Sequence, residues 1–268
     1  MKKRDKQIYF DEKEHKYFVE KEEFISVTTL ISEQFEEVKY PLFDKLKLNP
    51  SERGKQIHAW IEKFFKWKFL DVFCDETIYF STALIMKGLE MKDLDHDLFC
   101  EFNEFLTWFQ GVRGFCKIFL SEQVIYDEEF KIAGTPDAVF VTERDIISGD
   151  VLEIPQMILL DWKCTKNIEQ FSEKRSINPD LYHLMDCSFE KYKLQLSLYK
   201  YILEKRYDLK LSNTMYILQI GPHHTNKTIY QHGSSHWLIP MEYNSKNISI
   251  LLESRMASLL KKQEEKKE

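Results

Sequence analysis

Residues 157–164 have the sequence Met-Ile-Leu-Leu-Asp-Trp-Lys-Cys, and this run decides the fold class. Its first four residues are apolar, which is typical of a central strand that is covered on both faces of a β-sheet. Because side chains alternate along a strand, Asp161 and Lys163 share one face and Trp162 points to the other. A carboxylate and an ammonium in such a strand are costly to bury unless they pair or bind an ion.

A second carboxylate lies in the preceding strand-like run, residues 130–141, which contains Gly134-Thr135-Pro136-Asp137. Carboxylates on neighbouring strands can share a divalent cation, because Mg²⁺ prefers about six oxygen ligands and takes only a few from protein. Such a cation polarises a phosphate and activates a bound water, while a lysine can orient that water or stabilise charge on the phosphate. Asp137, Asp161 and Lys163 are therefore the candidate catalytic residues.

The tripeptide 161–163 is weak support when it is taken alone. An Asp and a Lys two residues apart arise often by chance and usually form a solvated strand face. The second carboxylate, Asp137, and the apolar character of the surrounding run favour the functional interpretation.

A helix before these strands supplies a further candidate ligand. Residues 51–68 have apolar side chains at helical spacing, with Ser51 as the expected N-cap, and carry His58 and Glu62 on one face. A lone histidine in this setting is more often a core or surface residue than a ligand. His58 and Glu62 also resemble half of a zinc site, but the helix signature of two His and a Glu is absent, so Mg²⁺ or Mn²⁺ is favoured.

The rest of the chain predicts an α/β fold in which short strands alternate with helices. The N-terminal part is expected to form a hairpin and a short helix capped by Ser26 or Thr28. The other expected elements are an aromatic-rich helix over about 98–114, strands over 117–126 and 130–141, a long loop over 165–189, a helix over 190–207, a strand pair at 214–220 and 228–231, and a helix from 245.

Composition narrows the class of protein. The 268 residues are 43% hydrophobic, so one domain with a sizeable core is expected. The net charge of −6 argues against a nonspecific nucleic-acid coat protein but allows a nuclease with a local basic channel. No run is apolar enough to cross a membrane, so an intracellular protein of the cytoplasm or nucleus, or a viral protein in an infected cell, is expected. Free thiols in a reducing compartment are expected for Cys74, Cys100, Cys116, Cys164 and Cys187.

In their order along the chain, these motifs resemble the PD-(D/E)XK nuclease superfamily, in the branch of RecB-type, Cas4-like and mitochondrial genome-maintenance exonucleases. The resemblance covers residues 51–201. The stretch 53–58, Arg-Gly-Lys-Gln-Ile-His, resembles the helical motif of the family, and residues 134–137 and 161–163 resemble its two strand motifs. Gln195 and Tyr199 match the Gln and Tyr pair of the branch, and residues four apart share a helix face.

The resemblance implies a restriction-endonuclease-like fold, with a central mixed β-sheet flanked by helices and an aromatic-rich helical lobe. A single domain over 1–268 is expected, with an N-terminal hairpin (7–30), a helical lobe (about 50–115), a catalytic core (about 116–232) and a C-terminal helix with a charged tail (245–268). The implied metal ligands are His58, Asp137, Asp161 and the backbone carbonyl of Trp162. Glu122 is either a further ligand or a paired surface carboxylate. The implied contacts with DNA are Gln195, Tyr199, Arg53 and Lys193.

The implied function is that of a monomeric, Mg²⁺- or Mn²⁺-dependent exonuclease acting on single-stranded or end-containing DNA in replication, recombination or repair. A structure-specific endonuclease and a non-catalytic DNA-binding module are the alternatives, and the intact catalytic residues speak against the second. No iron–sulphur cluster is expected, because no cysteine follows Cys187, where cluster-bearing relatives have three. Four C-terminal histidines are interpreted as a polar loop rather than a metal cluster: His223, His224, His232 and His236.

Overall fold

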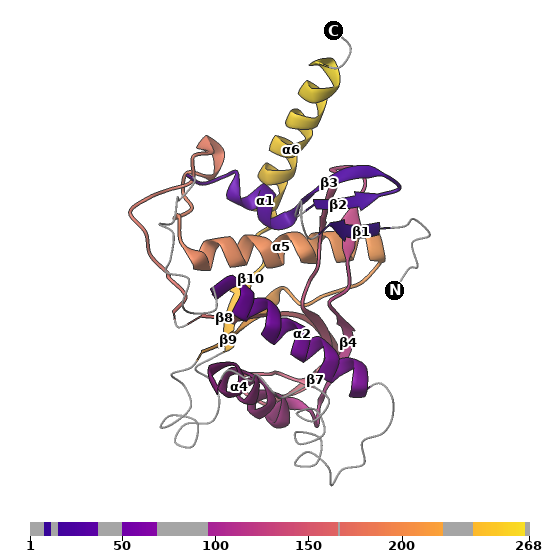
Figure 1. Ribbon diagram of the computed structural model, residues 1–268, viewed down its shortest axis with the longest axis vertical. Helices are drawn as coiled ribbons and strands as arrows, with labels where there is room; N and C mark the ends of the chain where they lie inside the picture. The colour runs from indigo at the N-terminus through magenta and orange to yellow at the C-terminus, as the bar shows by residue number, and fades with distance from the viewer. Residues whose placement is uncertain are drawn as a thin grey trace.

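Two mixed β-sheets of five strands each carry the fold (Figure 1). The computed structural model describes residues 8–11, 16–36, 50–68, 96–165, 167–221 and 238–265. The strand orders are β1-β2-β3-β6-β5 in the first sheet and β10-β9-β8-β7-β4 in the second. The expected mixed α/β architecture with flanking helices is confirmed, but the strands are divided between two sheets rather than gathered in one.

The first sheet joins N-terminal strands to a later hairpin. Strand β3 pairs in parallel with β6, with Ile25 opposite Ile132, and all other pairs of this sheet are antiparallel. Ser26 ends β3, and its Oγ accepts a hydrogen bond from the backbone of Thr29, so Ser26 caps the next helix as expected. The elements are β1 (Ile8–Asp11), β2 (Lys16–Val19), β3 (Glu22–Ser26), α1 (Val27–Ser32), β5 (Ile125–Asp127) and β6 (Ile132–Gly134).

Strand β8 (Val151–Cys164) is the centre of the second sheet and contains the apolar run that predicts it. It is antiparallel to β7 and parallel to β9, so it extends further toward its start than expected but has the expected central position. The expected strand at 228–231 lies outside the described residues, and β9 pairs instead with β10. The other strands are β4 (Cys116–Ser121), β7 (Ala138–Arg144), β9 (Thr214–Ile220) and β10 (Leu238–Glu242).

Helices cover both faces of the second sheet (Figure 1). On one face, α2 (Pro50–Lys68) and α4 (His96–Val112) form an aromatic cluster with Trp162, whose indole is stacked with Phe65 and meets Phe105 edge to face. On the other face, α5 (Ser188–Tyr207) packs with alternate residues of the strands, such as Leu159. None of the described helices combines the length and the apolar character that a membrane span needs.

Helix α5 lies between the two sheets and ends at Asp208, whose φ of 58° places it in the left-handed conformation typical of a helix end. Helix α6 (Ser245–Glu265) packs against α5, and its last turns extend away from the other helices and strands (Figure 1). The expected helices are therefore present. Helix α2 begins at Pro50, a residue that suits the first helical turn, so the expectation that Ser51 is the N-cap is wrong.

Two expected strands are each interrupted, and the chain moves from one sheet to the other at each interruption. The run 117–126 is divided between β4 and β5, where Glu122 has a φ of 47° that no extended strand adopts. The run 130–141 is divided between β6 and β7 at Thr135-Pro136-Asp137, because a proline has no N–H for a strand ladder. Glu122 and Asp137 therefore lie on connections between the sheets, not within strands.

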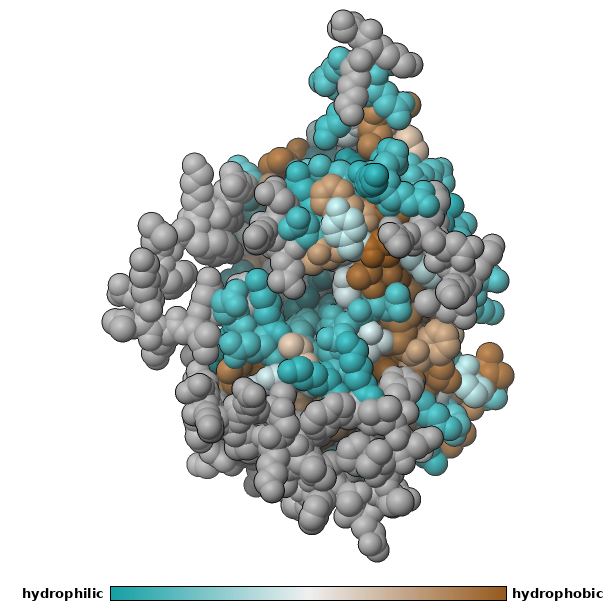
Figure 2. All heavy atoms as spheres, turned by 45° about the vertical axis from the view of Figure 1, so that its right-hand side comes forward, coloured by the Kyte–Doolittle hydropathy of each residue, from teal (hydrophilic) through white to brown (hydrophobic). Residues whose placement is uncertain are grey.

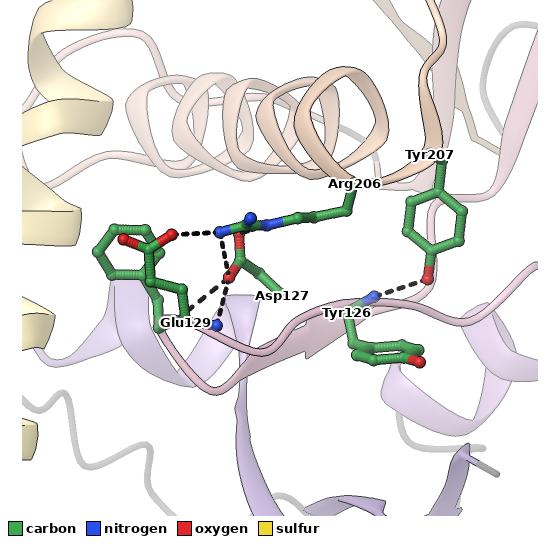
Figure 3. Close-up of polar contacts among 6 residues, drawn as sticks. Tyr126, Asp127, Glu129, Arg206 and Tyr207 are labelled. Carbon is green, nitrogen blue, oxygen red and sulfur yellow. Dashed lines mark hydrogen bonds and ion pairs between the residues drawn. The ribbon is translucent and has the colours of Figure 1, made fainter. Parts of the chain in front are cut away.

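The first sheet is fastened to the end of α5 by a buried ion pair (Figure 3). Arg206 Nε and Nη2 donate to the two oxygens of the fully buried Asp127 carboxylate, at 2.6 and 3.0 Å, and Nη2 also donates to Glu129. Beside this pair, the hydroxyl of Tyr207 accepts a hydrogen bond from the backbone of Tyr126 at 3.1 Å. These contacts hold the β5–β6 hairpin on α5.

Candidate metal centre

Charged side chains from three parts of the fold meet where the two sheets adjoin. Strand β8 supplies Asp161 and Lys163, the two connections supply Glu122 and Asp137, and α2 supplies His58. Near the middle of the face in Figure 2, at the level between α5 and α2, a hollow is lined mainly by hydrophilic side chains. The structure thus gathers residues that are far apart in the sequence.

Asp137 and Asp161 come together because of the register of β7 and β8. Ala138 of β7 is the partner of Leu160 of β8 in an antiparallel ladder. Asp137 directly precedes Ala138 and Asp161 directly follows Leu160, so the two carboxylates continue the ladder as neighbours. The sequence predicts this proximity, since it expects the two aspartates on adjacent strands.

His58, Glu122 and Asp137 form a group that could hold a metal ion. His58 Nδ1 lies 3.3 Å from Glu122 Oε1 and 3.4 Å from Asp137 Oδ1, and one ligand atom of each residue lies within 4.8 Å of the others. Glu122 thus lies within the group and is paired with His58, and its role as a ligand stays a prediction. One imidazole nitrogen with carboxylate oxygens is a donor set that Mn²⁺ and Mg²⁺ can accept.

The backbone around Asp137 fixes the direction of its carboxylate. Asp137 Oδ2 accepts a hydrogen bond from the backbone N–H of Trp162 at 2.8 Å, which leaves Oδ1 toward His58. The backbone N–H of Glu122 donates to the carbonyl of Asp137 at 2.9 Å, in the rare left-handed conformation of Glu122. Such conformations cluster at functional sites, where the surroundings stabilise them.

The backbone carbonyl of Trp162 is directed to the same region. In an extended strand, the N–H and C=O of one residue point to the same side, and the N–H of Trp162 points to Asp137. The indole of Trp162 is buried on the face of the strand opposite to Asp161 and Lys163, in the aromatic cluster of α2 and α4. The role of the Trp162 carbonyl as a metal ligand stays a prediction.

Asp161 and Lys163 form a buried ion pair next to the group of three. Lys163 Nζ lies 2.7 Å from Asp161 Oδ2 and 4.9 Å from the centre of the Tyr192 ring on α5. Asp161 Oδ1 is buried and accepts no hydrogen bond from any residue in the described part of the chain. A buried carboxylate oxygen without a donor is costly, and a cation would remove that cost.

The pKa values in the site reflect a concentration of negative charge. Burial, together with the charge of Asp137, raises the pKa of Glu122 to about 7 and that of Asp161 to about 6. Burial disfavours the charged form of His58, but the charges of Asp137 and Glu122 outweigh it and raise the pKa of His58 to about 10. The cationic His58 and Lys163 balance part of this negative charge, and a divalent cation could take the place of the His58 proton.

Lys163 stays protonated in this setting. Burial opposes its charged form, but the carboxylates of Asp161 and Asp137 outweigh burial and raise the pKa of Lys163 above its usual range. Burial also raises the pKa of the neighbouring Cys164 thiol. Cys164 and Cys187 are free thiols.

The side chains that are expected to contact DNA are buried, half-buried or already paired. Arg53 Nε and Nη2 donate to both oxygens of Glu101 on α4, at 2.8 and 2.6 Å, so the guanidinium already has a carboxylate partner. Gln195 Nε2 donates to the hydroxyl of Tyr199 at 3.1 Å on one buried face of α5, as the four-residue spacing predicts. Lys193 is half-buried on the same helix. Whether these residues contact DNA stays a prediction.

Sequence reasoning missed two residues beside the site. A Cβ on Gly134 would lie 2.5 Å from Cε1 of Tyr199, so only a glycine allows the ring to approach this closely. The hydroxyl of Tyr17, on β2, lies 3.0 Å from Thr135 Oγ1. Glycine before Thr-Pro-Asp is a signal for a close approach, whereas nothing in the sequence pairs Tyr17 with Thr135. The four candidate loop histidines, at 223, 224, 232 and 236, lie outside the described residues.

Fold and site together define a mixed α/β protein with a His-Glu-Asp group that could hold a metal ion. No protein-family model and no curated protein matches the chain. A crystal structure from Eubacterium rectale, named "putative exonuclease", aligns with 89% of this chain and 79% of that chain, with 10% sequence identity and a TM-score of 0.41. That likeness is too distant to carry an argument about function.

Proposed function

We propose that the chain is a metal-dependent nuclease that hydrolyses phosphodiester bonds of DNA. The observation that supports this most is the meeting of His58, Glu122 and Asp137 beside the Asp161–Lys163 ion pair. The order of these residues along the chain agrees with the PD-(D/E)XK superfamily and its RecB-like branch. We further propose that residues 1–268 act as one monomeric nuclease domain.

The donor atoms suit a hard divalent cation. His58, Asp137, Asp161, Glu122 and the carbonyl of Trp162 would hold Mg²⁺ or Mn²⁺, which prefer oxygen ligands and tolerate an imidazole. The Asp161 oxygen without a hydrogen-bond donor supports this fit. When bound, the ion would polarise the scissile phosphate and lower the pKa of a water molecule.

Lys163 acts in this proposal as a fixed positive charge. Its ammonium is oriented by Asp161 Oδ2 and by the ring of Tyr192, and its raised pKa keeps it protonated. A protonated lysine cannot take a proton from water, so it orients the water or stabilises the negative charge that develops on the phosphate.

The substrate side of the site is formed by α5 and α2. The Gln195–Tyr199 pair supports the segment that carries Asp137, through the contact of Tyr199 with Gly134, and Lys193 is the expected phosphate contact. Arg53 holds α2 to α4 through its ion pair with Glu101, so a DNA contact by Arg53 would require that ion pair to break. Exonuclease action on DNA ends, in replication, recombination or repair, is the proposed activity.

The test uses end-labelled and circular DNA, single- and double-stranded, with Mg²⁺, with Mn²⁺ or with a chelator. The wild-type protein is expected to degrade labelled linear DNA only with a metal ion and to leave circles intact. Asp137→Asn is expected to lose this activity, while Asp180→Asn, an exposed carboxylate in the 165–187 loop, keeps it. Cutting of circles would support an endonuclease instead. Binding of DNA without cleavage of any form would contradict the proposed activity.

A further inference from the structure

The first sheet reaches the candidate metal centre through one side chain. Tyr17 of β2 is only 7% exposed, and its hydroxyl lies 3.0 Å from Thr135 Oγ1. Thr135 is two residues before Asp137, on the connection that crosses from the first sheet to the second. Tyr17 therefore holds the segment whose last residue is a proposed metal ligand.

The crossing segment, residues 134–137, starts in the first sheet, where Gly134 pairs with Ile125 of β5, and it is held at four further points. Tyr199 of α5 packs on Gly134, Trp162 of β8 donates to the Asp137 carboxylate, and Glu122 donates to the Asp137 carbonyl. Tyr17 provides the fourth point, through Thr135. Of these four contacts, that of Tyr17 joins Thr135 to β2, so it holds the segment just beyond the point where the β5–β6 ladder ends.

We propose that Tyr17 is a positioning residue for Asp137 and acts through its hydrogen bond to Thr135. This inference rests on the proposed metal-dependent activity, because it assigns Tyr17 a role in presenting a metal ligand. The hydroxyl carries the role, since the aromatic ring has a separate packing function against Phe10, at 4.6 Å between ring centres. Loss of the hydroxyl lets Thr135 shift, and Asp137 shifts with it.

The electrostatic setting of Tyr17 agrees with this position. Burial, and to a smaller extent the charge of Glu122, raises the pKa of the phenol, although its bond to Thr135 acts in the opposite direction. Tyr17 thus stays neutral and lies within the electrostatic reach of a proposed metal ligand.

A matched control exists elsewhere in the fold. The hydroxyl of Tyr207 also makes one buried hydrogen bond, to the backbone of Tyr126 at 3.1 Å, and Tyr207 is 3% exposed (Figure 3). Tyr17→Phe and Tyr207→Phe therefore each remove one buried hydroxyl from a tyrosine. The first lies beside the metal centre, and the second holds the β5–β6 hairpin on α5.

The experiment measures direct Mn²⁺ binding to the full chain by electron paramagnetic resonance of free Mn²⁺, and then kcat and KM on end-labelled DNA. Tyr17→Phe is expected to weaken Mn²⁺ binding by about fivefold, the effect of one hydrogen bond, and to lower kcat with little change in KM. Thr135→Val should give the same loss of Mn²⁺ binding, whereas Thr135→Ser, which keeps the hydroxyl, should bind Mn²⁺ as the wild type does. The Tyr17→Phe/Thr135→Val double variant should bind Mn²⁺ no more weakly than either single variant.

Tyr207→Phe is expected to bind Mn²⁺ as the wild type does, even where its melting temperature falls. If Tyr17→Phe and Thr135→Val bind Mn²⁺ as tightly as the wild type, the inference is overturned and the bond is only structural. A wild-type protein that binds no Mn²⁺ would contradict the proposed function itself. Because Thr135→Val breaks the same hydrogen bond and leaves Tyr17 unchanged, it keeps the test decisive even if Tyr17→Phe fails to fold.

Discussion

Lys163 has two neighbours that direct its ammonium, the Asp161 carboxylate at 2.7 Å and the Tyr192 ring at 4.9 Å. An oriented charge of this kind stabilises a transition state without the need to reorganise during the reaction. The carboxylate alone would leave the long lysine side chain several orientations. The aromatic ring restricts it further, since a cation over a ring face is attracted to that face.

Lys163→Ala is expected to lower kcat by about 100-fold, because it removes a charge that stabilises the developing negative charge. Mn²⁺ should still bind, since Lys163 is not a proposed ligand. Lys174→Ala removes an exposed lysine paired with Glu36 and serves as the control with unchanged kcat. Steady-state cleavage of labelled DNA measures both, and an undiminished kcat for Lys163→Ala would refute its role.

Gly134→Ala is expected to lower the free energy of unfolding by about 1–3 kcal/mol, because the new Cβ would lie 2.5 Å from the Tyr199 ring. Gly111→Ala is the matched control, since its Cβ would meet no atom within 4 Å and alanine favours a helix by up to about 1 kcal/mol. Urea denaturation compares the two variants. Equal stability of both would show that the Tyr199 ring moves freely away from Gly134.

At this scale the sequence predicts residue types better than their contacts. Asp137, Asp161 and Lys163 stand out because charge in an apolar strand is costly, and the structure brings them together with His58. The roles of individual residues stay predictions. Tyr17 could not be found in this way, because its partner Thr135 is far along the chain and belongs to no periodic pattern.

At the scale of elements, the sequence predicts central strand β8 from its apolar run, and helices α2, α4 and α5 from apolar residues at helical spacing. It misses the two interruptions, at Glu122 and at Pro136. The short strands on either side of each interruption are apolar, so together they look like one longer strand. A strand that changes sheets keeps the alternation of an unbroken one. Only the tertiary partners of the two halves distinguish these cases.

The ion pair between Arg206 and Asp127 fastens the β5–β6 hairpin to α5, and Arg206→Met should therefore cost about 3 kcal/mol of stability. The cost arises because the fully buried Asp127 carboxylate loses its charged partner. Lys174→Met, at an exposed pair, should cost less than about 1 kcal/mol. Chemical denaturation tests both variants, and similar losses would show that the Arg206 pair is solvated.

At the scale of the whole molecule, a metal ion that binds the native state but not the unfolded chain should stabilise the fold. The reason is that unfolding separates His58, Glu122 and Asp137. Mn²⁺ at 100 times its dissociation constant should add about 2.7 kcal/mol, which raises the melting temperature by several degrees. A chelator should reverse the shift, and Asp137→Asn should remove it. Equal shifts in the wild type and in Asp137→Asn would indicate binding elsewhere.

The parallel pairing of Ile25 with Ile132 also bears on how the chain folds during synthesis. The N-terminal strands cannot complete their sheet until β6 has left the ribosome, and pairing between distant segments is intrinsically slow. The ligand group is completed by residues on either side of that strand, Glu122 and Asp137. Assembly of the centre therefore waits until β6 and Asp137 have been synthesised, and a nascent chain halted before β6 would lack Asp137 and could not complete the ligand group.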